Sequence, residues 1–180
     1  MTPRIMSVVT APSTVAGKYK VEENISSLSA IAYTKLKFKD VTVKLEAVYA
    51  ENATDLTMIG GFAVKEIAPG SLRYQYTNKA TGSVWAEAQT NGKDIQYGLF
   101  LGYTSNLGTK DKVVNGLIYG RGANIDYVYR IAPRVVFISG KLNIAVEGEY
   151  TTVNYGKTIN DKSIAHDQTQ ISNIRGLLSF

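Results

Sequence analysis

Polar and apolar residues alternate with a period of two along most of this chain, and this alternation restricts the fold more than any other feature. In residues 28–38, Leu28 and Phe38 share one parity, whereas Lys35 and Lys37 share the other. Such a period is typical of a β-strand whose two faces meet different surroundings. Similar segments follow at residues 41–49, 84–89, 95–103, 124–137, 142–151 and 172–180. The pattern predicts an all-β protein with about seven antiparallel strands.

The connections between these segments alternate between short and long. The short ones are turn sequences, of which Asn-Gly is the strongest hairpin signal: Lys39-Asp40, Asn91-Gly92 and Gly140-Lys141. The long ones are polar or irregular and cover residues 51–80, 104–122 and 153–168. Within the first, Tyr74 and Tyr76 indicate an early start of the strand that leads to Trp85. Outer-membrane barrels have short periplasmic turns and longer external loops. The connections therefore favour an antiparallel transmembrane β-barrel.

The strand count bears on whether the chain closes a barrel alone. Bacterial barrels normally close with an even number of strands. Residues 4–10 could supply an eighth strand, or the chain is the C-terminal part of a larger barrel. We treat residues 1–180 as one barrel domain or barrel fragment, with an irregular or unassigned start at 1–26. The terminal aromatic, Phe180, is the usual ending of an outer-membrane strand.

Composition is compatible with a membrane crossed by strands. No apolar run approaches the roughly 18 residues that a membrane helix needs, but a barrel strand needs only about 9–11. A hydrophobic content of 44% indicates a folded chain. The net charge of +5 is modest, and the Lys and Arg residues alternate with apolar residues instead of clustering. We therefore expect no nucleic-acid partner.

The residue types that would support catalysis or metal binding are scarce. The chain has no Cys, which excludes disulfides and thiolate metal sites, and it has a single His. That residue, His166, lies in a polar segment beside Ser163 and Asp167, and neighbours in one loop rarely form a catalytic triad. We expect no enzyme, no catalytic or metal-binding residue and no cofactor.

The ionisable residues of the regular strands should share the water-filled side. A Lys or Arg on the lipid side at mid-membrane would cost roughly 2–4 kcal/mol. The candidate lumen residues are Lys37, Lys44, Glu46, Glu87, Asp126, Arg130, Glu147, Glu149 and Arg175. Two interpretations stay open for each of them. It either biases which solutes pass through a channel, or it pairs with an opposite charge on a neighbouring strand and braces the wall. Tyr49, Tyr103 and Tyr150 are candidates for an aromatic girdle at one membrane interface.

Three stretches resemble the C-terminal half of porin-like outer-membrane proteins of the Bacteroides group, and more loosely the DcaP-type trimeric porins. They are Val41–Phe62, Thr90–Gly108 and Tyr119–Gly156, and the most specific part reads YGRGANIDYVYRIAPR. The resemblance implies a large antiparallel barrel, passive passage of small solutes and a homotrimer.

The main hypothesis is a porin-type channel in the outer membrane of a Gram-negative bacterium, with lipid outside and small polar or charged solutes inside. Loops 105–122 and 154–168 would lie at its outer mouth, and one of them could fold inward. A small closed barrel is filled by side chains, so a non-conducting anchor or adhesin is an alternative. A third hypothesis is a soluble, lipocalin-like carrier, in which the apolar parity would line the cup and the charged parity would face water.

Overall fold

The computed structural model describes residues 4–10, 18–68, 74–114, 116–159 and 163–179, and these form an all-β protein. Phe180 lies outside the described residues. The elements are β1 (Arg4–Thr10), β2 (Lys18–Asn24), β3 (Ser29–Lys37), β4 (Val41–Glu51), the short 3-10 helix η1 (Ala53–Leu56), β5 (Gly60–Ile67), β6 (Tyr74–Thr90), β7 (Ile95–Thr109), β8 (Ile118–Arg121), β9 (Ile125–Ser139), β10 (Leu142–Ile159) and β11 (Ser163–Ser179).

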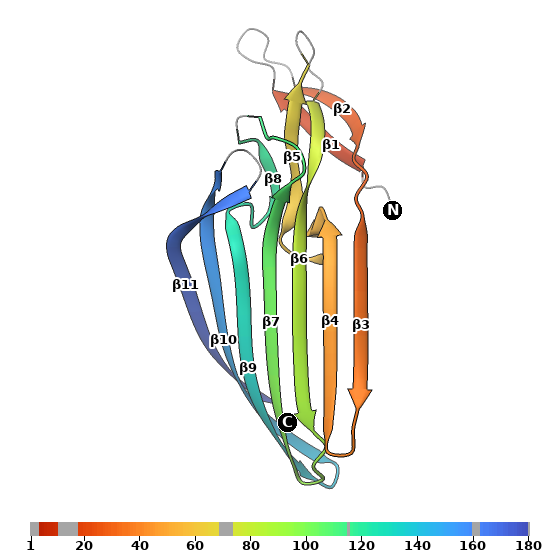
Figure 1. Cartoon of the computed structure of the whole chain (residues 1–180), viewed down its shortest axis with the longest axis vertical. Helices are drawn as coiled ribbons and strands as arrows, with labels where there is room; N and C mark the ends of the chain where they lie inside the picture. The colour runs from red at the N-terminus through yellow and green to blue at the C-terminus, as the bar shows by residue number, and fades with distance from the viewer. Residues whose placement is uncertain (1–3, 11–17, 69–73, 115, 160–162, 180) are drawn as a thin grey trace.

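Nine strands form one antiparallel sheet, which is open in the described part of the chain (Figure 1). Its main path runs β11-β10-β9-β7-β6-β4-β3, so each strand pairs with its neighbour in a meander. β5 pairs with the far end of β6, and β8 pairs with β5. The strands of the main path correspond to those that the alternation predicts, and the antiparallel arrangement is confirmed.

Short turns join the strands at one end of the sheet, which we call the turn end; the opposite end is the loop end (Figure 1). The turns are tied to one another. The Asn91 side chain donates to the carbonyl oxygens of Phe38 and Lys39 in the neighbouring turn, at 2.9 and 3.3 Å. Position 92 requires glycine, because a Cβ there would lie 2.0 Å from the carbonyl oxygen of Ile95. The turn residues thus fix the register of neighbouring hairpins.

Beyond the alternating segments, the strands continue further than the sequence predicts. β10 reaches Ile159 and β11 starts at Ser163, so the predicted loop over residues 153–168 is wrong. β7 likewise continues to Thr109. β6 starts at Tyr74, so the early start indicated by Tyr74 and Tyr76 is confirmed. These extensions lie outside the apolar band described below, where both faces of a strand carry polar residues and the period of two disappears.

The start of the chain also differs from the prediction. Arg4–Thr10 is a strand, but it pairs with Lys18–Asn24 in a separate two-stranded sheet. It is therefore not an eighth strand of the main sheet. The irregular segment predicted over 1–26 contains both of these strands instead.

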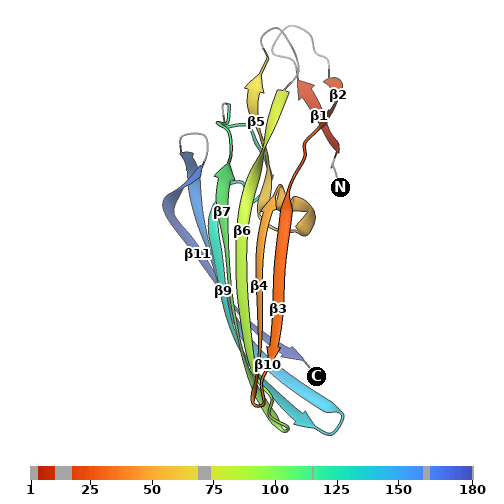
Figure 2. The ribbon, with the colours of Figure 1, turned by 45° about the vertical axis from the view of Figure 1, so that its right-hand side comes forward.

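The main sheet is curved, and two connections fold onto its concave face at the loop end (Figure 2). The first contains η1, whose Ala53 packs against Val48 and Ala50 of β4. The second runs from the end of β7 through β8 to β9. It is held by a backbone hydrogen bond from Val114 to Val64 and by the side chain of Asn106, which donates to the carbonyl oxygen of Ile125 at 3.0 Å. The loop end is therefore the most densely packed part of the described chain.

Candidate functional site

The two faces of the main sheet differ in chemistry, as the alternation predicts. On the outward, convex face the large apolar side chains are exposed. They include Leu36, Phe38, Leu45, Tyr49, Val84, Ile95, Tyr97, Leu99, Leu101, Tyr103, Ile131, Phe137, Ile144, Val146, Ile174 and Leu178. This apolar band extends over residues 129–137 of β9, and nine residues match the about 9–11 that a strand needs to cross a membrane.

Tyrosines collect on the outward face where the apolar band ends toward the loop end. The rings of Tyr103 and Tyr127 stack with centroids 5.7 Å apart, and those of Tyr129 and Tyr150 lie 6.1 Å apart. Tyr49 is exposed on β4 at the same level, opposite Gly82. The three tyrosines predicted to form an aromatic girdle, Tyr49, Tyr103 and Tyr150, therefore lie along one edge of the apolar band.

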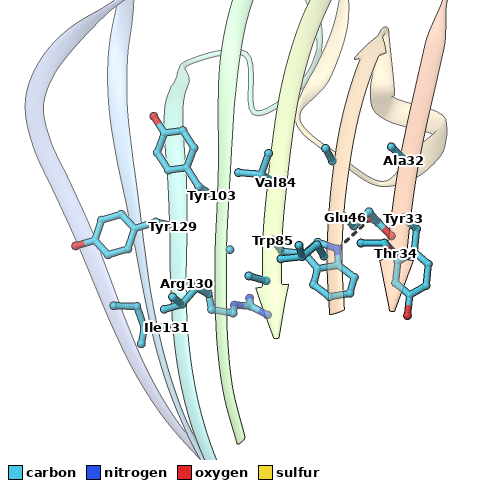
Figure 3. A pocket seen from close by; sticks show the side chains of 15 residues that line it. Ala32, Tyr33, Thr34, Glu46, Val84, Trp85, Tyr103, Tyr129, Arg130 and Ile131 are labelled. Atoms are coloured by element: carbon cyan, nitrogen blue, oxygen red, sulfur yellow. Dashed lines mark hydrogen bonds between the residues drawn. The ribbon is translucent and has the colours of Figure 1, made fainter. Parts of the chain in front are cut away.

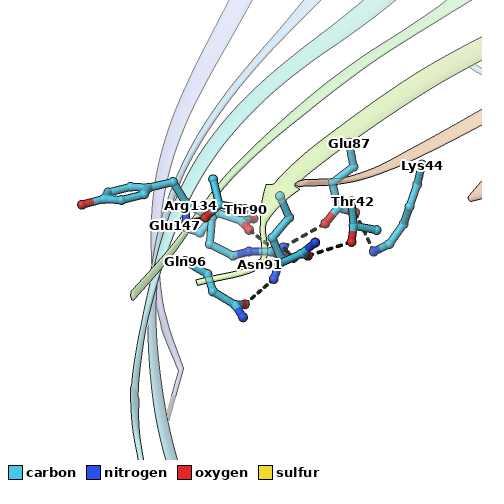
Figure 4. Close-up of polar contacts among 10 residues, drawn as sticks. Thr42, Lys44, Glu87, Thr90, Asn91, Gln96, Arg134 and Glu147 are labelled. Carbon is cyan, nitrogen blue, oxygen red and sulfur yellow. Dashed lines mark hydrogen bonds and ion pairs between the residues drawn. The ribbon is translucent and has the colours of Figure 1, made fainter. Parts of the chain in front are cut away.

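The inward, concave face carries a line of paired charges across the sheet (Figure 4). Lys44 Nζ on β4 lies 3.2 Å from Glu87 Oε2 on β6. Arg134 Nη2 on β9 lies 2.8 Å from the other carboxylate oxygen, Glu87 Oε1. Arg134 Nη1 lies 3.8 Å from Glu147 Oε2 on β10. The charges thus alternate in sign along the line, which links four strands.

Arg134 reaches Glu87 only by crossing β7, and Gly98 makes that crossing possible. Gly98 pairs with Arg134 on one side and with Gln89 on the other. A Cβ at position 98 would lie 3.4 Å from both Nε and Nη2 of Arg134. The guanidinium also donates to Gln89 Oε1 at 2.9 Å. The missing side chain of Gly98 therefore provides the space through which two non-adjacent strands are joined.

A second group of polar contacts lies closer to the loop end. Arg130 Nη1 lies 3.2 Å from Glu149 Oε2, and its Nε donates to Thr151 Oγ1 at 3.0 Å. Glu46 accepts a hydrogen bond of 3.0 Å from the indole of Trp85. A pocket of about 230 Å³ lies between the two groups, lined mainly by Arg130, Arg134, Glu87, Glu147, Glu149 and Phe100.

In each of these ion pairs the cation is more exposed than the carboxylate. The Arg130 side chain is 47% exposed and that of Glu149 only 9%. Lys44 and Arg134 are 31% and 30% exposed, against 16% for the Glu87 that they share. In the pair of Arg134 with Glu147 the difference is small, at 30% against 27%. Formal charges within these pairs are balanced, and the cations contribute more of the exposed surface than the carboxylates do.

The remaining candidate residues lie at the margins of this arrangement. Lys37 is exposed at the end of β3, opposite Thr42. Asp126 is half-buried near the start of β9, at the loop end. Arg175 is exposed on β11, opposite Glu149 in the register. Of the nine candidates, the described ion pairs join Lys44, Glu87, Arg130, Glu147 and Glu149.

Sequence reasoning missed Lys79, because it lies in a segment predicted to be irregular. Its side chain is 2% exposed on the inward parity of β6, beyond the apolar band, and Nζ donates to the carbonyl oxygen of Ala123 at 2.9 Å. Burial lowers the pKa of Lys79 from 10.5 to about 8. Arg134 and Gly98 were also missed. Gly98 lies between the strands of Arg134 and Glu87, and no local sequence pattern indicates that Arg134 lies beside it.

Comparisons with protein-family models, with curated proteins and with solved structures give no match. The resemblance to porin-like proteins therefore stays a prediction. Among the described residues, no cluster of His, Cys, Asp and Glu is suited to hold a metal ion. The described residues also include no helix of the length and apolarity required to span a bilayer.

Proposed function

We propose that this sheet is part of the wall of an outer-membrane β-barrel channel, through which small polar or charged solutes diffuse passively. The observation that carries the proposal is the pairing of an exposed apolar outward face with a charged, curved inward face. Exposed apolar patches of this extent are unusual on soluble proteins, whereas lipid would cover them. A soluble carrier would require the opposite arrangement, with the apolar rows inside the cup.

Closure of such a barrel needs strands in addition to the main path. The path has an odd number of strands that are all antiparallel, so its edge strands β3 and β11 run in the same direction. Antiparallel closure therefore needs an odd number of further strands that run the other way. Exposed apolar residues on the inward side of both edge strands, among them Ile31, Tyr33, Ile171 and Leu177, support such a completion. Three such barrels in a homotrimer would fit the porin resemblance.

The inward face favours anions among the solutes. The side chains of Arg130 and Arg134 are 47% and 30% exposed, against 9% for Glu149 and 16% for Glu87. Because the field near a narrow wall depends on the nearest charges, a permeating anion would meet the guanidinium groups first. The ion pairs keep these arginines in place, so the bracing and selectivity interpretations apply to the same residues.

Planar-bilayer recording tests the proposal. We expect steps of conductance and, in a salt gradient, a reversal potential that indicates anion preference. The double variant Arg130→Gln/Arg134→Gln should shift that potential toward cations. Lys141→Gln removes one positive charge at the turn end, outside the candidate wall, and should leave it unchanged.

Two outcomes would contradict the proposal. A folded protein that inserts into bilayers but passes no current would favour the non-conducting anchor. A chain that stays monomeric in buffer without detergent would contradict any membrane function.

A further inference from the structure

Three neighbouring pockets, together called the groove, lie along the outward face from the middle of the apolar band past the tyrosine row. Two apolar pockets of about 670 and 490 Å³ share Ala32, Ala47, Val84 and Tyr103. The second pocket joins a third, of about 460 Å³, through Tyr49 and Leu107. Figure 3 shows the pocket of about 670 Å³, with Tyr103 and Tyr129 at one side and Ala32 and Thr34 of β3 at the other.

Small side chains form the floor of the apolar part. In the register Ala32 lies opposite Ala47, and Gly82 lies opposite Tyr49. Larger residues, Leu45, Val84, Leu101 and Tyr103, stand beside this floor and are all exposed. The result is an open, apolar depression between side chains, over which an acyl chain can lie.

The third pocket is polar and contains charges of both signs. It is lined in part by Glu51, Asn78, Lys110 and Asp111. Asn78 Nδ2 donates to the carbonyl oxygen of Ser26 at 2.6 Å and to Glu51 Oε2 at 3.2 Å. The same Glu51 oxygen accepts the backbone N–H of Leu28 at 3.1 Å. The carboxylate is therefore held in place, and Lys110 and Asp111 line the same pocket.

We propose that this groove binds one glycerophospholipid with a zwitterionic headgroup. An acyl chain would lie along Ala32 and Ala47, where the groove is apolar. The headgroup would lie beyond the tyrosine row, with its phosphate near Lys110 and its ammonium group near Glu51 and Asp111. The order of apolar and polar parts along the groove matches that of a membrane lipid. The inference rests on the proposed membrane location.

Native mass spectrometry of the detergent-solubilised chain tests this inference, with dioleoyl phosphatidylethanolamine and dioleoyl phosphatidylglycerol as probes. We expect one phosphatidylethanolamine retained per chain, and about tenfold weaker retention of the anionic phosphatidylglycerol, which meets two carboxylates and one lysine. Ala47→Phe fills the groove and should lower retention of phosphatidylethanolamine about tenfold, equivalent to the loss of roughly two methylene contacts.

Ala88→Phe is the matched control, because Ala88 is exposed on the outward face of β6 but lies outside all three pockets. It should retain phosphatidylethanolamine like the unmodified chain. Equal retention by Ala47→Phe and Ala88→Phe, equal retention of both lipids, or no retained lipid would overturn the inference. So would a change in oligomeric mass in Ala47→Phe alone, because a second copy would then be the occupant.

Failure of this inference can be told apart from failure of the proposed channel. A protein that conducts in bilayers but retains no lipid contradicts only the groove. A protein that does not enter bilayers contradicts the channel itself.

Discussion

Lys79 is a fully buried cation at the loop end, and its position makes stability depend on pH. Its pKa falls to about 8 in the folded chain from 10.5 in the unfolded one, because burial disfavours the charged form. Between these values the unfolded chain binds more protons, so the free energy of unfolding should rise as pH increases from 8 to 10.5. The full effect is roughly 3 kcal/mol.

Urea unfolding in detergent from pH 7.5 to 10 measures this dependence. We expect the midpoint to rise with pH in the unmodified chain and to lose most of this rise in Lys79→Met. Lys110→Met replaces an exposed lysine and should keep the rise. If Lys79→Met retains the same slope as Lys110→Met, then Lys79 is not the titrating group.

At the scale of the strand, β7 contributes to the charged face by lacking a side chain at Gly98, where Arg134 passes over it to Glu87. Gly98→Val should stop Arg134 from reaching Glu87, since the new side chain would occupy the path of the guanidinium. Loss of a charge-assisted contact outweighs the better strand propensity of Val, so we expect destabilisation of about 1–2 kcal/mol. Urea unfolding at constant pH in detergent measures it.

Gly148→Val serves as its control. Gly148 lies in β10, also inside a strand, and a Cβ there would meet nothing within 4 Å. This variant should be neutral or slightly stabilising, because Val loses less conformational entropy in a strand than Gly. Equal stability of the two variants would mean that the contact between Arg134 and Glu87 contributes little.

Strands were predictable where two different environments act on them, and less so elsewhere. In 95–103 the apolar and polar faces of the sheet impose a period of two, so β7 was evident there. Its continuation to Thr109 was not, because cross-strand pairing alone maintains it. β8 was also missed; it is four residues long and depends on pairing with β5, which is distant in sequence.

The candidate site was predictable from the sequence only in part, for the same physical cause. The charged parity identified Glu87 and Glu147 as inward-facing, since any other placement would be costly in a membrane. It did not identify their partner Arg134, although that residue lies on the same parity of β9. The pairing depends on the order of strands in the sheet and on Gly98, which only the structure supplies.

For the whole molecule, the decisive question is which medium wets each face, and the single tryptophan can report it. Trp85 lies on the inward face, where its indole donates to Glu46. In vesicles of phosphatidylcholine, its fluorescence should therefore be quenched by aqueous acrylamide and little affected by lipids with brominated acyl chains. Moving the indole by one residue, in Val84→Trp/Trp85→Phe, places it among the exposed apolar side chains of the outward face. Because successive residues of a strand point to opposite faces, quenching should then reverse: strong with brominated lipid, weak with acrylamide. Brominated lipid that quenches Trp85 more strongly than Trp at position 84 would mean that lipid contacts the charged face, and the proposed channel would be wrong.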